Sequence, residues 1–272
     1  MDRIMVGVDF SKTSLAAIRL ATDVAFRANA DLLVVWVQTA EMDYDEAEAK
    51  LKELVASAQK KLVNNKAEYL IAKNGKIYTA LNNVLKEYRS DLLVIGTHGN
   101  SGFDEKFAGA NAFKTVTCSH APVLTVRENF NFDKPLERII MPIDSTRDTR
   151  QKVPWTIEFS KMFPGTQIHV LGIFSYKNKT IRGEVEGYVN SVEKLLDSKH
   201  VKYVTDYVES ENTTLSTIEY ATKVNADLIV IMSEQEKTFS NIFLGPYAQQ
   251  MLNLSPIPVL TVSVRQVNGE SR

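Results

Sequence analysis

Short runs of apolar residues alternate with longer segments of helical period along the whole chain. Residues 32–37, Leu-Leu-Val-Val-Trp-Val, form an almost continuously apolar run, and the other runs are similar. Strands read in this way when helices cover both faces of a parallel sheet. The alternation of such runs with helical segments indicates βαβ units, and therefore an α/β fold built on parallel strands.

Five strands are expected in each half of the chain, with helices between them. They are predicted at residues 3–8, 31–37, 67–72, 91–95 and 123–126, and again at 138–143, 167–173, 202–208, 227–232 and 259–263. The helix over residues 13–28 begins near Ser11 or Thr13, either of which can cap its exposed N–H groups. Its apolar face is expected to hold Leu15, Ile18, Ala21, Thr22 and Ala25. Ten strands in two doubly wound sheets result.

The two halves of the chain repeat one another. Residues 3–9 align with residues 138–144, and both runs end in an aspartate. The pentapeptide Pro-Val-Leu-Thr-Val occurs twice, at 122–126 and 258–262. A repeat of this length is a whole domain rather than a solenoid unit. The predicted organisation is a first domain at 1–127, a linker at 128–137, a second domain at 138–264 and a tail at 265–272.

The repeated pentapeptide forms the last strand of each domain, which is expected at the edge of its sheet. Unpaired N–H and C=O groups at an edge invite pairing with another strand. The natural partner of each copy is the other copy. Residues 122–126 are therefore predicted to lie antiparallel to residues 258–262, so that the domains pack as a pseudo-two-fold pair. Such a chain could be a monomer or form a homodimer of tandem units.

Composition narrows the function classes. Hydrophobic residues make up 44% of the 272 residues and charged residues 24%, as in ordinary globular proteins. The formal net charge of −1 lacks the basic footprint of a nucleic-acid-binding protein. Cys118 is the only cysteine, which excludes an internal disulfide and a cysteine-based zinc cluster. With no apolar run near the ~20 residues of a membrane span, we expect a cytoplasmic protein without membrane or nucleic-acid partners.

Ligands of doubly wound folds bind beyond the carboxyl ends of the strands, where the strand order reverses. The loop after the fourth strand has Gly96 and Gly99 at its start and Gly109 at its end. The first two allow the backbone to approach a ligand, and the third opens a helix whose N–H groups favour an anion. The alternative is a turn that only connects strand to helix. The position of the loop beside Asp9 favours a phosphate.

These landmarks carry a family resemblance. The spacing Gly96-X2-Gly99-X9-Gly109, Asp9 at the end of the first strand, and residues 120–126 resemble the universal stress protein family. The resemblance covers residues 1–127 and, through the repeat, 138–264. It implies a tandem protein of two five-stranded domains of the adenine nucleotide alpha hydrolase type. In nucleotide-binding members it also implies an ATP site, which Mg²⁺ could accompany.

By the same resemblance, Asp9 and Val37 would flank adenine, while Gly96 and Gly99 would lie beside the ribose and phosphates. Residues 109–111 would contact the phosphates. The full set of expected cofactor-binding residues is Val8, Asp9, Phe10, Val37, Ile95, Gly96, His98, Gly99, Gly109, Ala110 and Asn111.

Two departures from the family pattern bear on the site. Ala110 stands where nucleotide-binding members have Ser or Thr, so one hydroxyl contact is missing, and Asn111 could partly replace it. The corresponding loop of the second half, residues 232–246, keeps only Gly245. Glu234 and Glu236 in that loop would repel a phosphate. We therefore expect ATP only in the first domain.

Other polar residues have simpler interpretations. Asp9 and Asp144 are expected to cap the turns that follow their strands, and neither is assigned a catalytic role. His98 could contact ribose or phosphate, or be an exposed loop residue. His120 and Cys118 have no neighbour that would complete a nucleophile or metal arrangement, so structural roles are expected. The charged segment 41–61 is expected to be a solvated helix face rather than a partner surface.

The leading hypothesis is a stress-response protein that binds ATP or a related adenine nucleotide in its first domain and acts as a nucleotide-dependent regulatory or sensor module. The alternative is a regulatory or scaffolding stress protein that binds no nucleotide, and in either case a protein partner is unknown. A nucleotide hydrolase ranks third, because no general base or P-loop lysine is evident.

Overall fold

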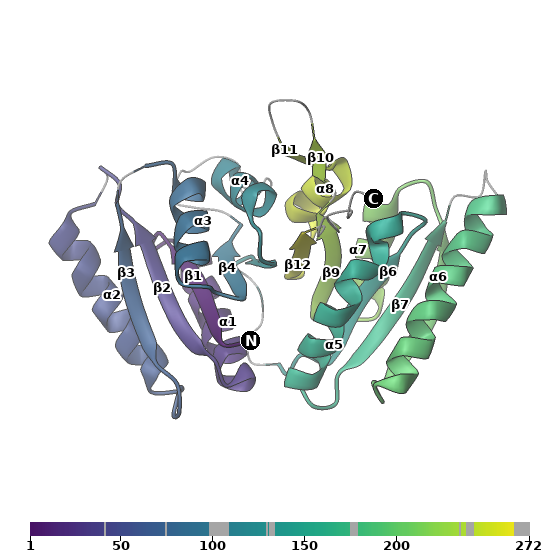
Figure 1. Ribbon diagram of the computed structural model, residues 1–272, viewed down its shortest axis with the longest axis horizontal. Coiled ribbons are helices and arrows are strands. Elements are labelled where there is room, and N and C mark those ends of the chain that lie inside the picture. Colours follow the sequence, from purple (N-terminus) through teal and green to yellow (C-terminus); the bar gives the residue numbers. More distant parts are fainter. Residues whose placement is uncertain are drawn as a thin grey trace, which may run out of the picture.

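The computed structural model of the chain describes residues 1–40, 42–73, 75–97, 109–128, 130, 134–174, 179–233, 235–237 and 242–263. Two sets of strands lie side by side, and helices cover both faces of each set (Figure 1). No helix among these residues is both long enough and apolar enough to cross a membrane.

The first domain alternates strand and helix from its first residues. Its elements are β1 (Arg3–Val8), α1 (Lys12–Ala28), β2 (Asp31–Val37), α2 (Tyr44–Gln59), β3 (Ala67–Ala72), α3 (Ile77–Glu87), β4 (Leu92–Gly96), α4 (Ala110–Cys118) and β5 (Val123–Val126). Ser11 is the N-cap of α1 and accepts a hydrogen bond from the Ser14 N–H, as predicted. Asn29, in the left-handed conformation, ends that helix.

The second domain repeats this order with one added hairpin. Its elements are β6 (Arg138–Ile143), the 3₁₀ helix η1 (Arg147–Lys152), α5 (Val153–Met162), β7 (Gln167–Phe174), α6 (Lys179–Ser198), β8 (Tyr203–Glu209), α7 (Thr213–Lys223), β9 (Leu228–Ser233), β10 (Gln235–Lys237), β11 (Ile242–Leu244), α8 (Pro246–Leu254) and β12 (Val259–Ser263). The ten predicted strands are all present, each with bounds within one residue of those predicted. The antiparallel β10–β11 hairpin was not predicted.

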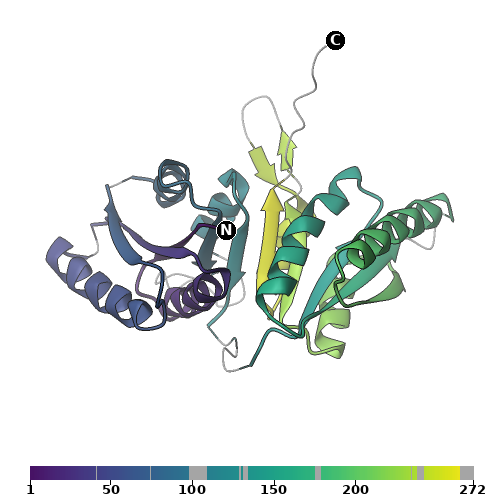
Figure 2. The ribbon, with the colours of Figure 1, turned by 60° about the horizontal axis from the view of Figure 1, so that its bottom comes forward.

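The ten long strands form one continuous sheet, which corrects the expectation of two. Their order is β3-β2-β1-β4-β5-β12-β9-β6-β7-β8, and neighbours are parallel within each domain. Figure 2 shows β12, in yellow, in the middle of this sheet. The sheets merge because the two edge strands pair with each other, so that neither domain has a free edge at the junction.

The pairing of the two pentapeptides is confirmed. β5 and β12 run antiparallel, with Leu124 opposite Leu260 and Val123 opposite Thr261. Leu124 therefore faces its own counterpart in the repeat, as a pseudo-two-fold axis requires. The Thr125 hydroxyl donates to the carbonyl of Val259 at 3.2 Å.

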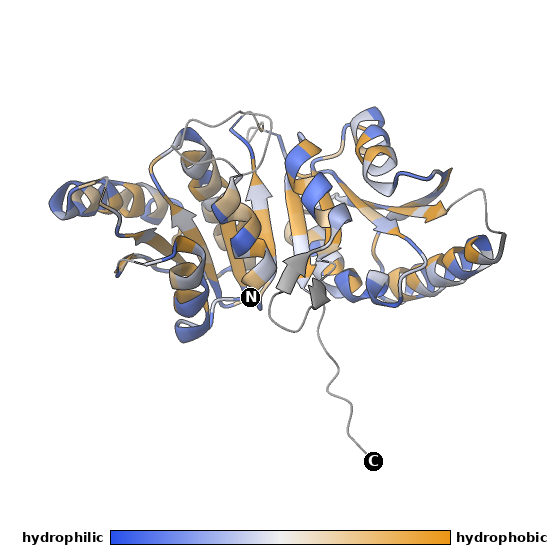
Figure 3. Cartoon of the chain, turned by 90° about the horizontal axis from the view of Figure 1, so that it is seen from above, coloured by the Kyte–Doolittle hydropathy of each residue, from blue (hydrophilic) through white to orange (hydrophobic). Residues whose placement is uncertain are grey.

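The hydrophobic core also crosses the domain boundary. One buried cluster, on the side of α1, α2 and α5, joins Leu124, Ile139, Phe159 and Leu260. A second cluster lies on the opposite face, under α3, α4, α7 and α8. Figure 3 shows the strands coloured as hydrophobic and the outer helix faces as largely hydrophilic. The two domains therefore share one sheet, and each of these two clusters holds residues of both domains.

The sequence predicted an apolar face for α1 and a solvated, charged face for α2. On α1, Ile18, Ala21, Thr22 and Ala25 are buried as expected, but Leu15 is 39% exposed and lies at the flank of the helix. The charged helix α2 has a solvated face, as predicted. Its salt bridges Lys50–Glu46 and Lys52–Glu48, of 2.7 and 2.9 Å, join partly or fully exposed side chains four residues apart.

Candidate functional site

A cavity of about 450 Å³ lies at the carboxyl ends of β1, β2 and β4, and α3 and α4 complete its walls. The strand order reverses at this point of the sheet, because β1 lies between β2 and β4. Open α/β sheets bind ligands at this position. The volume is within the usual range of small-molecule sites.

Most of the predicted residues line this cavity. They are Val8, Asp9, Val37, Ile95, Gly96, Gly109, Ala110 and Asn111. Phe10 is not among the lining residues, and His98 and Gly99 lie outside the described residues. The two predicted loops, after β1 and after β4, therefore meet at one cavity.

Further lining residues had not been predicted. They are Gly7, Ser14, Trp36, Thr39, Met42, Ile77, Leu81, Thr97, Ala112 and Thr115. Trp36 and Thr39 flank the end of β2, a position that the prediction represented by Val37 alone. Ile77 and Leu81 are four residues apart on α3 and hence on one helix face. The four-residue spacing of these two apolar residues was the sequence feature that could have placed α3 beside the cavity.

Asp9 caps the turn that follows β1. Its Oδ1 accepts hydrogen bonds from the N–H of Ser11 at 3.0 Å and from the Ser11 hydroxyl at 2.5 Å. The Asp9 N–H in turn donates to Oγ of Ser14 at 3.3 Å. This arrangement orders the first turn of α1 beside the cavity, and it bears out the capping interpretation.

Asp144 occupies an equivalent turn after β6. Its Oδ1 accepts from the N–H and the hydroxyl of Thr146 at 2.9 and 2.6 Å, and its own N–H donates to Oγ1 of Thr149 at 3.3 Å. The two turns are therefore the same hydrogen-bonded unit, built once from serines and once from threonines.

Phe10 follows Asp9 in the left-handed region, with φ of 62°. Such a conformation is uncommon for a residue with a Cβ. Its ring lies 6.3 Å from the Trp36 ring, centroid to centroid, and the Lys50 ammonium lies 5.4 Å over it. Phe10 thus covers Trp36 on the side of α2, which explains why it does not line the cavity.

The packing of β4 against α1 requires glycine at position 96. A Cβ at this position would lie 2.8 Å from the carbonyl carbon of Thr13 and 2.9 Å from its Cβ. Real Cβ atoms do not come this close to backbone atoms, so the end of β4 can touch α1 only because residue 96 is glycine. Gly96 also lines the cavity, and its predicted place beside ribose and phosphates stays a prediction.

Gly109 is the N-cap of α4 and brings the helix to the cavity. Its N–H donates to the carbonyl of Thr97 at 2.7 Å, which holds residue 109 against the end of β4. No described residue caps the helix with its side chain, and residues 109–112 line the cavity. The N–H groups and the dipole of a helix N-terminus favour a negatively charged group.

The charge of the lining is unusual for a phosphate site. Among the described lining residues Asp9 is the only one with a charged side chain. Within this described lining, the N–H groups at the start of α4 are therefore the source of positive potential. The remaining lining is mainly apolar, with the hydroxyls of Ser14, Thr39, Thr97 and Thr115.

The second domain carries bulkier side chains at the matching positions of its last helix. The segments that begin at Gly109 and Gly245 correspond, so Tyr247 matches Asn111 and Met251 matches Thr115. Met251 is fully buried and Tyr247 packs against the same cluster. The predicted phosphate repulsion by Glu234 and Glu236 concerns side chains that lie outside the described set.

Titratable groups elsewhere form no second candidate centre in the described part of the chain, and no group of three His, Cys, Asp or Glu side chains there could hold a metal ion. Burial and, secondarily, the charge of Lys86 lower the pKa of His120. Cys118 is exposed.

Comparisons with known proteins agree on one family. The sequence model of the universal stress protein family matches residues 1–127 and, a second time, residues 135–263. A solved universal stress protein from Archaeoglobus fulgidus DSM 4304 has a TM-score of 0.76 at 16% identity, covering 97% of this chain and 98% of its own. A putative universal stress protein from Pseudomonas aeruginosa UCBPP-PA14 has a TM-score of 0.70 at 12% identity, covering 97% and 93%.

A universal stress protein solved in complex with cAMP matches a single domain, with 23% identity over 46% of this chain and 96% of its own and a TM-score of 0.36. No curated protein matches the chain significantly in sequence.

Proposed function

The chain belongs to the universal stress protein family, and from this premise we propose that its first domain binds ATP or a related adenine nucleotide. The bound nucleotide would make the protein a regulatory or sensor module of a stress response, in the cytoplasm, with the second domain as its scaffold. The observation that carries the proposal is the cavity at the strand-order reversal, which is lined by the N-terminal residues of α4.

The lining supports binding of the adenine ring in one region of the cavity and of the phosphates in another. Val37, Ile77 and Leu81 give β2 and α3 an apolar wall that suits an adenine ring. The N–H groups at the start of α4 suit the phosphates. Asp9, fixed by Ser11, lies between β1 and these regions, where a carboxylate can accept hydrogen bonds from adenine or ribose. Mg²⁺ would reach the site with the phosphates.

The duplicated aspartate offers a matched test of this proposal. Asp9→Ala and Asp144→Ala remove the same two hydrogen bonds from equivalent turns, so each should cost ~0.5–2 kcal/mol of stability. Only Asp9→Ala should weaken the binding of ATP, measured by titration calorimetry with AMP and cAMP as competing ligands. Equal loss of affinity in both variants, or no loss in either, would place the nucleotide elsewhere.

A second candidate function is a regulatory or scaffolding protein that binds no nucleotide. Ala110, without a hydroxyl at the start of α4, and a described lining without a cationic side chain favour it. The two functions differ in what the purified protein carries. Adenine nucleotide in the supernatant after denaturation, identified by mass spectrometry, supports the first function. Its absence, together with no calorimetric response to millimolar ATP, supports the second.

A further inference from the structure

A second cavity, of about 510 Å³, lies where the two domains meet. Its lining includes Leu124 of β5, Leu228 of β9 and Pro258 beside β12, and it lies on the face of the sheet that α1 and α5 cover. Residues of α1, α2, α5 and the linker form the rest of its walls. Neither the predicted site residues nor the proposed function uses this cavity.

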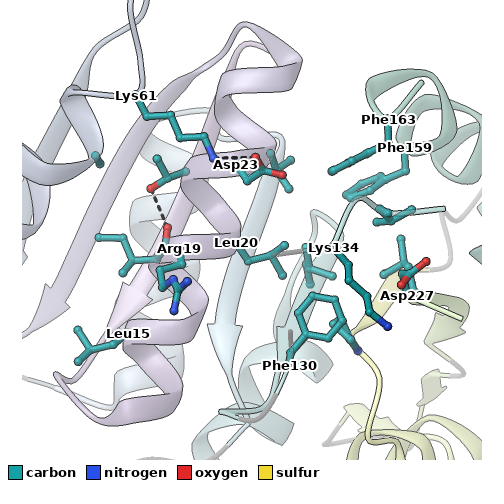
Figure 4. Close-up of a pocket in the computed structure, with 18 of the residues that line it drawn as sticks. Leu15, Arg19, Leu20, Asp23, Lys61, Phe130, Lys134, Phe159, Phe163 and Asp227 are labelled. Carbon is teal, nitrogen blue, oxygen red and sulfur yellow. Dashed lines mark hydrogen bonds and ion pairs between the residues drawn. The ribbon is translucent and has the colours of Figure 1, made fainter. Parts of the chain in front are cut away.

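The walls of this junction cavity are mostly apolar and come from both domains. Figure 4 shows Leu20 of α1 on one side, Phe159 and Phe163 of α5 on another, and Phe130 of the linker below them. The lining continues around α1 to Leu15 and to Leu54 of α2. Because Leu15 is 39% exposed, a ligand there would remove apolar surface from water.

The depth of the cavity suits a slender ligand. Its lining reaches from Leu124 and Leu228, each 1% exposed beneath the helices, to the exposed side chain of Lys134. A protein surface could not follow this path inward. Since the apolar lining comes from several separate elements and bends around α1, a flexible chain fits it better than a rigid flat ring.

The charges around the cavity favour an anionic head group. Two carboxylates line it, and both already accept hydrogen bonds: Asp23 from Arg27 at 3.0 Å and Lys61 at 2.7 Å, and Asp227 from the backbone N–H groups of residues 137 and 138 at 2.9 and 3.0 Å. Three cationic side chains, Arg19, Lys61 and Lys134, line the same cavity. Lys134 has no ion-pair or hydrogen-bond partner among the described residues.

We propose that the junction cavity binds a medium-chain carboxylate. The alkyl chain lies between α1, α5 and the linker, and the carboxylate lies beside Lys134. This site is independent of the nucleotide site, because the two cavities share no lining residue.

The test is titration calorimetry of the full chain with octanoate, decanoate and dodecanoate below their micellar concentrations. Affinity should rise about fourfold for each added methylene until the cavity is filled. Dodecyltrimethylammonium, whose alkyl chain is one carbon longer than that of dodecanoate and whose head charge is opposite, should bind about tenfold more weakly than dodecanoate. Similar affinity for both head groups would overturn the proposal, as would no binding of any carboxylate.

Two charge-reversal variants distinguish binding in the cavity from a non-specific attraction of the carboxylate to surface lysines. Lys134→Glu should lower dodecanoate affinity about tenfold, whereas Lys60→Glu, at an exposed residue outside the cavity, should leave it unchanged. Phe130→Ala should also weaken binding, and thermal unfolding shows that each variant is folded. Equal losses in the two lysine variants would contradict the proposal. So would a ligand-independent dimer that buries this face, seen by sedimentation, because a second copy would then close the mouth of the cavity.

Discussion

Asp9 and Asp144 show how much a residue's role depends on what surrounds it. The hydrogen bonds of the two carboxylates are equivalent, so local chemistry alone does not distinguish them. The difference lies at the last helix of each domain, where Asn111 in one corresponds to Tyr247 in the other. Asp9 thus borders a cavity that the second domain's larger side chains would narrow.

A glycine substitution tests the packing role of Gly96. Gly96→Ala places a methyl group 2.8 Å from the Thr13 carbonyl carbon, so the end of β4 and α1 must separate. We expect a loss of ~1–3 kcal/mol in the free energy of unfolding, measured with urea. In the control Gly109→Ala, the nearest heavy atom to the new Cβ is the Thr97 oxygen at 3.6 Å. Its cost should stay below about 1 kcal/mol, and a reversed order would contradict the packing account.

A buried histidine should make the stability depend on pH. Nδ1 of His169 lies 2.9 Å from the Tyr220 hydroxyl, which donates to Asp206. Burial lowers the pKa of His169, and the Arg138 charge acts in the same direction. The unfolded chain therefore takes up a proton at a higher pH than the folded chain does. This contribution to stability is complete above the ordinary pKa of about 6.5 and is lost as the pH falls toward the lowered value.

His169→Gln should reduce this loss, measured as the change in unfolding free energy between pH 7.5 and 5.5. His120, whose pKa is also lowered, remains in the variant and retains part of the effect. An unchanged difference between the two pH values would show that His169 titrates alike in the folded and unfolded states.

At the scale of elements, the apolar pattern predicted the long strands well because each is buried on both faces and thus has an unbroken apolar run. The β10–β11 hairpin escaped prediction because its strands have three residues each and the first, Gln235–Lys237, is wholly polar. The start of α1 is replaced by the 3₁₀ helix η1 in the second domain, where Met232 stands in place of Gly96. A methionine side chain needs room that the close approach of α1 to Gly96 does not leave.

Leu124 of β5 and Leu260 of β12 are predicted to be energetically coupled across the junction of the two domains. Leu124→Ala and Leu260→Ala each remove a buried side chain and should each cost ~2–5 kcal/mol. The double variant should differ from the sum of the single variants by ~0.5–3 kcal/mol, because the two residues are directly opposite. Leu124→Ala combined with Leu196→Ala, from a separate buried cluster, is the control and should be additive within about 0.5 kcal/mol. Additivity in both pairs would mean that the domains do not depend on this contact.

At the scale of the whole molecule, one ten-stranded sheet carries two cavities that share no lining residue, and α1 lines both, with Ser14 in one and Leu20 in the other. Much of the first cavity could be predicted, because strand ends and a glycine-opened helix leave local signals. The junction cavity could not, since its walls come together only when α5 packs beside α1. The pairing of the two copies was foreseeable, but the space that it leaves depends on individual side chains.

We propose that only the first of the two homologous domains binds an adenine nucleotide. Titration calorimetry of the unliganded full chain with ATP and Mg²⁺ tests it most directly. We predict one site per chain, abolished or strongly weakened by Asp9→Ala and retained in Asp144→Ala. Two sites per chain, or no binding at millimolar ATP, would contradict this account.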